Sequence, residues 1–377
     1  MLTVRFNLVP PGVILLTSLL IVWLGLSGIA RGDELGYGGE FARRQVLWLA
    51  IASITATIVW MIPYQRIKGF SYPFFAVTLL LLGAVYFFPA RFGARRWIFL
   101  GPISIQPSEL AKVTFIFALS EYLMFRRNHR TLPGLIPPLM MTLVPVLLIL
   151  REPDLGTSLL FFPVMFGMLF IAGARRRHLL AVILAGIALS PVVWSNMSAE
   201  QKSRVTAVFL QRDGAVTDMG DGYHLHQSKQ LLALGGIWGS EWNGERVDDP
   251  RAYRLPAGRT DFVYCLVGER WGLTGTLGAL LLFSLLILSG LHVAACTRDP
   301  YGRLMSTGIV VMFAAQVIIN TAMTVGLAPV TGLTLPLMSY GGSSLVTLGV
   351  CIGLLLNIAS TPEFDVAGQP FQFDPSA

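Results

Sequence analysis

Long apolar runs separated by short turns dominate this sequence, and they limit the folds that the chain can adopt. A helix needs about 20 mostly apolar residues to cross the hydrocarbon core of a bilayer. The ten stretches that approach this length are 8–29, 45–64, 70–90, 108–125, 133–150, 156–173, 178–195, 271–294, 305–328 and 342–360. We therefore expect an all-α polytopic membrane protein with about ten transmembrane helices and a large loop between spans seven and eight.

The composition agrees with a membrane protein and excludes several other classes. Only 13% of the 377 residues are charged, about half the share that soluble domains carry. The net charge of +7 comes from basic residues in short turns, so we expect no nucleic-acid partner. Cys265, Cys296 and Cys351 lie in or beside apolar runs without a CxxC pair. They predict neither a disulfide framework nor a zinc site.

The distribution of basic residues predicts the orientation in the membrane. One set of turns is almost free of acids and holds Arg5, Arg66, Lys68, Arg126, Arg127, Arg130, Arg175, Arg176, Arg177, Arg298 and Arg303. The alternating set mixes acidic and basic residues. Cytoplasmic loops carry the excess of Lys and Arg. We therefore expect both termini in the cytoplasm and the loop at 195–270 outside.

The longest polar stretch lies within 220–272. Its polar part closes at Thr260-Asp261-Phe262, just before the chain becomes apolar again. A carboxylate at the mouth of a membrane span is a functional-site hypothesis by default. The alternative is a solvated loop whose acids face water. The stretch also contains His224 and His226, and an HxH pair on a strand can bind metal. Without a third ligand nearby, a hydrogen-bonding role is favoured.

Charged residues also gather at the outer ends of the spans. Glu109 and Lys112 are three residues apart in the fourth span and share one helix face. They indicate either a polar cavity or a buried structural ion pair. Arg96 and Trp97 precede this span. They suit an anionic ligand at the membrane interface, or simple anchoring there.

Two further outer turns carry residues that could bind an anion or only shape the backbone. Glu152 and Asp154 lie at the start of the sixth span, where acids also stabilise a helix N-terminus. The glycine pair at 341–342 follows Ser339 and Tyr340 and precedes the last span. Its amides could hold an anion, although a glycine pair also marks an ordinary turn.

Taken together, these motifs resemble the shape, elongation, division and sporulation (SEDS) family of polytopic membrane proteins, over roughly residues 10–360. The motifs that carry the resemblance are 93–97 (GARRW), 106–109 (QPSE) with Lys112, 153–158 (PDLGTS), 227–228 (QS), 235–236 (GG), 255–256 (LP), 260–262 (TDF) with Glu269, 335–336 (LP) and 339–344 (SYGGSS). Their order along the chain makes the resemblance specific. The chain departs from the family's usual pattern at Ala257, where a glutamate is common, and at Arg270.

The resemblance implies a peptidoglycan glycosyltransferase that polymerises lipid II at the outer face of the bacterial cytoplasmic membrane. The PDLGTSLL sequence resembles the RodA branch, which implies a role in cell elongation and shape. The alternatives are an FtsW-like division polymerase and a lipid II flippase or transporter. Implied partners are a class B penicillin-binding protein, which is a transpeptidase, and other elongation-machinery proteins. We expect one membrane domain, 1–360, and a short disordered cytoplasmic tail, 361–377.

The implied reaction is an inverting attack by a sugar hydroxyl on a lipid-linked pyrophosphate donor. Such a hydroxyl needs a base, and the leaving pyrophosphate needs cations. Asp261 is predicted as the base, or as the ligand of a divalent cation, Mg²⁺ or Mn²⁺; no other cofactor is expected. The residues predicted to bind or orient the substrate are Arg44, Arg96, Trp97, Glu109, Lys112, Asp154, Gln227, Ser228, Thr260, Glu269, Ser339, Tyr340 and Ser343.

Overall fold

The computed structural model describes residues 9–36, 40–89, 95–100, 103–125, 130–152, 154–209, 221–245, 247 and 250–361. The predicted tail lies outside the described residues, apart from Thr361. The longer helices are α1 (Val9–Glu34), α2 (Phe41–Met61), α3 (Ser71–Ala84), α4 (Pro107–Phe125), α5 (Ile136–Arg151), α6 (Leu155–Ile171), α7 (Arg176–Asn196), α8 (Ala199–Phe209), α9 (Asp221–Gly235), α11 (Val263–Cys296), α12 (Pro300–Thr324) and α13 (Gly342–Ser360). The shorter elements are η1 (Tyr64–Phe70), η2 (Val85–Phe87), η4 (Pro133–Leu135), α10 (Ser240–Asn243), η5 (Pro250–Tyr253) and the hairpin of β1 (Ile98–Leu100) and β2 (Ile103–Ile105).

The expected architecture of about ten spans is confirmed. Within the described residues, eight helical segments are long and apolar enough to cross a membrane. Two more spans are α4, which carries several charged residues, and α6, which has 17 residues. The eighth span differs from the expected 271–294, because α11 begins at Val263 and passes through a non-helical residue, Gly272.

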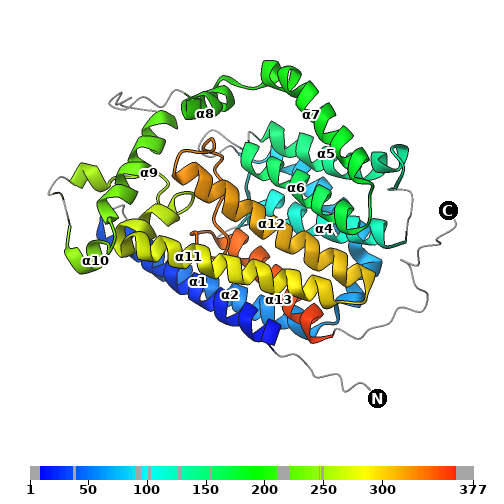
Figure 1. Cartoon of the computed structure of the whole chain (residues 1–377), viewed down its shortest axis with the longest axis horizontal. Coiled ribbons are helices and arrows are strands. Elements are labelled where there is room, and N and C mark those ends of the chain that lie inside the picture. The colour runs from blue at the N-terminus through cyan, green and yellow to red at the C-terminus, as the bar shows by residue number, and fades with distance from the viewer. Residues whose placement is uncertain are drawn as a thin grey trace.

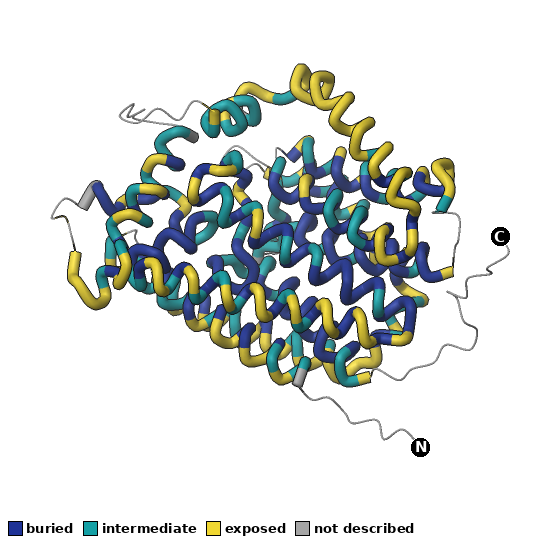
Figure 2. Tube along the Cα trace, viewed as in Figure 1, coloured by how far each residue is buried: buried dark blue, intermediate teal, exposed yellow. Residues whose placement is uncertain are grey.

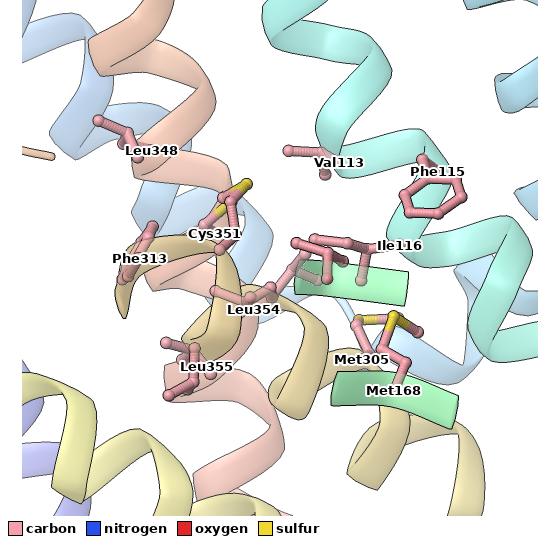
Figure 3. Packing of buried hydrophobic residues seen from close by; sticks show 14 of the residues in the cluster. Val113, Phe115, Ile116, Met168, Met305, Phe313, Leu348, Cys351, Leu354 and Leu355 are labelled. Carbon is pink, nitrogen blue, oxygen red and sulfur yellow. The ribbon is translucent and has the colours of Figure 1, made fainter. Parts of the chain in front are cut away.

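The centre of the bundle is formed by α4, α12 and α13. Of the eight candidate spans, α12 and α13 are the most buried, and most residues of α4 are buried as well. Side chains of α4, α6, α12 and α13 meet there, including Ile116, Met168 and Cys351 (Figure 3). At Gly308 of α12, an added Cβ would lie 2.7 Å from Ile116 and 2.9 Å from Met168. Small residues at such crossings let membrane helices pack closely.

The large loop between α7 and α11 is mostly helical where it is described. It contains α8, α9 and α10, and the polar stretch at 220–272 includes α9, α10 and the first part of α11. The buried positions Leu225, Ser228, Leu231 and Gly235 recur every three or four residues, which is the spacing of one helix face. Figure 1 shows α7, α8 and α9 arching along one side of the bundle.

Candidate active site

A cavity of about 750 Å³ opens at one end of the helical bundle. Its walls come from the starts of α2, α4, α6 and α13, from α8 and α9, and from the turn that precedes α11. Of the residues predicted for the site, those that line the cavity are Asp261, Arg44, Arg96, Trp97, Glu109, Asp154, Thr260 and Tyr340. The fold therefore brings together residues that are more than 200 positions apart in the sequence.

Asp261 stands at the end of a tight turn. The carbonyl of Ala257 accepts hydrogen bonds from the amides of Thr260, Asp261 and Phe262, at 3.1, 3.0 and 3.3 Å. The carbonyl of Asp261 itself accepts a hydrogen bond of 2.8 Å from the Asn320 side chain of α12. These contacts fix the backbone on both sides of the carboxylate, so its position in the cavity is well determined.

The surroundings of Asp261 favour a proton acceptor. Burial raises the pKa of Asp261 to about 6, and the negative charge of Asp154 adds to the rise, whereas Thr260, Arg204 and Arg96 oppose it. A carboxylate with this pKa is ionised at pH 7 and is a stronger base than an exposed aspartate.

Three arginines give the cavity its positive charge. Arg44 extends from α2 and Arg204 from α8. Arg96 precedes β1, and its Nε donates to the carbonyl of Glu152 at 2.8 Å. Guanidinium groups bind phosphate oxygens in pairs. The site therefore combines one base with several groups suited to a phosphorylated ligand.

Glu109 and Lys112 form a buried ion pair, which is one of our two interpretations of their spacing. Lys112 Nζ lies 2.9 Å from Glu109 Oε1, and the two side chains are 3% and 7% exposed. Glu109 also lines the cavity, whereas Lys112 does not. The pair is thus a buried structural contact, and its glutamate also forms part of the cavity wall.

Asp154 serves as the N-cap of α6. One carboxylate oxygen accepts from the Thr157 amide at 3.1 Å, and the other accepts from the Thr157 hydroxyl at 2.9 Å. Gln106 donates to the same second oxygen at 3.4 Å. Asp154 therefore caps α6 and also lines the cavity, and its role toward the substrate stays a prediction.

The turn before α13 is held against α2. Gln45 donates to the carbonyl of Ser339 at 3.0 Å and accepts from the amide of Gly341 at 3.4 Å. At Gly342, an added Cβ would lie 2.5 Å from Trp48. Gly341 and Gly342 line the cavity, so the amino end of α13 reaches its wall.

The remaining predicted residues lie outside the cavity lining, which leaves their predicted roles untested. They are Lys112, Gln227, Ser228, Glu269, Ser339 and Ser343. Glu269 forms a paired contact with Arg31, at 2.8 and 2.9 Å. Ser228 donates to the carbonyl of Thr324 at 3.0 Å.

Several lining residues had not been predicted for the site. Arg204 and His224 belong to the large loop, where polar residues gave no sign of which would face inward. His224 lies on α9 with its ring stacked on Phe262, at 6.5 Å between centroids. His226 is exposed. Among the described residues, no three His, Cys, Asp or Glu side chains gather as a metal cluster.

Comparison with known proteins places the chain among bacterial cell-wall enzymes. A family model described as "Cell cycle protein" (FTSW_RODA_SPOVE) matches residues 7–363. The chain is 34% identical to the probable peptidoglycan glycosyltransferase FtsW of Aeromonas salmonicida, over 84% of this chain and 80% of that protein. It is 30% identical to the peptidoglycan glycosyltransferase MrdB of Escherichia coli, over 92% of this chain and 90% of that protein.

A solved structure has the same fold. It is described as showing the structural coordination of polymerization and crosslinking by a peptidoglycan synthase complex. The similarity has a TM-score of 0.80 at 32% identity, and covers 93% of this chain and 98% of the other.

Proposed function

Because the chain belongs to the FtsW, RodA and SpoVE family and is a peptidoglycan glycosyltransferase, we propose that Asp261 is the base of a lipid II polymerase. The acceptor's sugar hydroxyl attacks the anomeric carbon of the donor, and Asp261 takes the hydroxyl proton. A new C–O bond forms as the bond from that carbon to the lipid pyrophosphate breaks. A single displacement of this kind inverts the anomeric centre.

The observation that carries the proposal is the placement of Asp261 in one cavity with three arginines. A base within reach of the nucleophile can accelerate such a reaction by about 10²–10⁴-fold. Pyrophosphate accumulates negative charge as it leaves, and fixed cations stabilise that charge. Arg44 and Arg96 are the groups that we assign to the pyrophosphate, beside the amides at the start of α13.

The same carboxylate fits a divalent cation shared with the substrate. Magnesium often takes one or two protein carboxylates and completes its coordination with phosphate oxygens and water. In the cavity, Asp154 caps α6 and Glu109 pairs with Lys112, which leaves Asp261 as the residue that would hold the ion. Bound Mg²⁺ or Mn²⁺ would supply charge neutralisation at the pyrophosphate.

A second cavity supports a lipid-linked substrate. It measures about 560 Å³ and lies between α5, the start of α6, and α7 with α8. Leucines and valines form most of its wall, including Leu147, Leu155 and Val192. An isoprenoid chain is compatible with such a surface, and the diphosphate that it carries is compatible with the charged cavity.

The orientation and the cellular role are also proposals. The basic turns support both termini in the cytoplasm and the charged cavity outside, in the bacterial cytoplasmic membrane. A reporter fused after residue 250 should be accessible only from outside; a cytoplasmic signal would reverse this orientation. The RodA-like sequence PDLGTSLL supports elongation rather than division, and the solved synthase complex supports a class B transpeptidase as partner.

The flippase alternative receives less support from the fold. A transporter needs polar groups that lead from one side of the membrane to the other. At the opposite end of the bundle two aromatic residues are buried and packed together: Tyr64 and Tyr301 are 0% and 1% exposed. Their rings stack at 6.5 Å, and the Tyr301 hydroxyl lies 2.9 Å from that of Ser71.

The decisive experiment is lipid II polymerisation by the purified protein with its transpeptidase partner, in wild-type and Asp261→Asn forms. Asparagine keeps the shape of the side chain and removes the base, so the rate should fall at least about 100-fold. Glu40→Gln, an acid paired with Arg43 on the exposed surface, is the matched control and should polymerise normally. Full activity of Asp261→Asn would remove this residue from the chemistry. Lipid II transport without polymer would favour the flippase.

A further inference from the structure

Helix α8 is built as a separate unit in the large loop. Its start is fixed by a capping box: Ser198 Oγ accepts from the Gln201 amide at 3.2 Å, and Gln201 Oε1 accepts from the Ser198 amide at 3.0 Å. Lys202 Nζ donates to the carbonyl of Ser195 at the end of α7, at 3.3 Å. These local contacts define the start of the helix.

This short helix borders both cavities. Gln201 lines the apolar cavity, and Arg204 lines the charged cavity that contains Asp261. The two residues are three positions apart, so they project from neighbouring positions on one helix face. A ligand with an apolar chain and a diphosphate group would therefore contact α8 at both of its parts.

Within the described structure, α8 packs against few other elements. It packs chiefly against α9, and the preceding helix α7 has one buried residue, Leu179. Figure 2 shows α7 exposed along most of its length, and Figure 1 shows α8 on the arch beyond the bundle. Elements with few buried contacts open and close at low free-energy cost.

The charge of Arg204 acts on the catalytic carboxylate. It lowers the pKa of Asp261, in the same direction as Arg96 does. Arg204 is therefore close enough to Asp261 to interact with it electrostatically. It is also the one cavity arginine that a lightly packed helix carries, since Arg44 extends from α2 and Arg96 adjoins the β1–β2 hairpin.

We propose that α8 is a lid over the charged cavity, and that Arg204 binds the diphosphate of the lipid-linked donor when the lid is closed. The proposal rests on the proposed function, because it assigns a further ligand to the same substrate. Arginine binds phosphate oxygens bidentately. Closure over the donor brings a third cation to the leaving group and separates the cavity from water.

Binding of undecaprenyl pyrophosphate to the purified protein tests this assignment without turnover. Arg204→Gln should weaken binding about 10- to 100-fold, as expected for the loss of one charged hydrogen-bonding group. Arg204→Lys should recover part of the loss. Arg43→Gln removes the same charge from an exposed surface pair outside the cavity and should bind normally. Unchanged binding by Arg204→Gln overturns the proposal, even if lipid II polymerisation confirms the proposed function.

A second readout separates direct contact from a structural effect. Arg204→Gln should raise KM for lipid II more than it lowers kcat. The thermal midpoint should match that of Arg43→Gln. A uniform loss of kcat with an unchanged KM would show that Arg204 only supports the fold.

Discussion

Two sides of the charged cavity are built in opposite ways. The fixed wall consists of α9, which lines the cavity, with α10 and the first part of α11, 263–272, behind it. Close backbone contacts hold α9 to α11, and ion pairs join α11 to α1. The loose wall consists of α8, which lines the cavity and packs chiefly against α9 in the described structure, and of α7, the largely exposed span before it. The fixed wall lies beside the base, and the loose wall carries Arg204. The difference shows how one site can hold a reacting carboxylate still while a large lipid enters and leaves.

The fixed wall depends on glycines at the crossing of α9 with α11. An added Cβ at Gly235 would lie 1.9 Å from the carbonyl oxygen of Gly268. Gly239 and Gly272 have φ angles of +84° and +68°, which residues other than glycine rarely adopt. By contrast, Gly186 on α7 has no atom within 4 Å of an added Cβ.

The largest expected effect comes from breaking the ion pair of the fixed wall. Arg31→Met leaves the Glu269 carboxylate, whose side chain is 1% exposed, without its paired contact. Removing one partner of a buried pair typically costs about 3–5 kcal/mol. Thermal unfolding in detergent should show a large drop, whereas Arg43→Gln, in a pair that is 81% and 73% exposed, should melt as wild type. Equal melting of both variants would contradict the distinction between the walls.

The sequence predicted the spans well and the cavity only in part. Apolar length and basic turns are local signals, so the spans could be read from them. Asp261, Arg96 and Glu109 stood out because charged residues beside membrane spans are costly. Arg204 and His224 could not be found in this way. They lie in a polar loop, where only the packing of α8 and α9 decides which side chains face inward.

Glu269 shows the opposite limit of sequence reasoning. Its motif predicted a substrate-binding or supporting residue. The structure pairs it with Arg31 outside the cavity lining, so that role stays a prediction. A buried acid that orients the fixed wall and one that contacts substrate look alike in a sequence. The distinguishing fact is a partner 238 positions away, which local spacing cannot reveal.

The second prediction compares the same change, glycine to alanine, at one position in each wall. Gly235→Ala forces apart two helix backbones, and overpacking of this kind costs about 1–3 kcal/mol or more. Gly186→Ala meets no neighbour and gains up to about 1 kcal/mol of helix propensity. Unfolding midpoints in the same detergent should therefore move in opposite directions. Similar midpoints for the two variants would show that the α9–α11 contact does not limit stability.

The third prediction concerns the base on the fixed side of the site. The pKa of Asp261 is raised to about 6 by burial, so the carboxylate loses its basic form as the pH falls through 6. At pH 5 about a tenth of the molecules retain the ionised form, and kcat/KM should fall to about a tenth of its plateau. The measurement is polymerisation rate against pH, with folding checked at each pH. A rate that stays level down to pH 4.5 would exclude Asp261 as the titrating base.

The smallest expected effect is at Ala257, whose carbonyl holds the turn before α11. Its φ of +53° is unfavourable for an L-residue by about 1–2 kcal/mol. Glycine adopts this φ without strain, but it loses more conformational entropy on folding, so only part of the strain energy is recovered. Ala257→Gly should therefore raise the unfolding midpoint slightly. Leu337 has a similar φ of +61° but is 6% exposed, so Leu337→Gly removes a packed side chain and should lower the midpoint. If both glycines raised it, backbone strain rather than packing would determine stability at these turns.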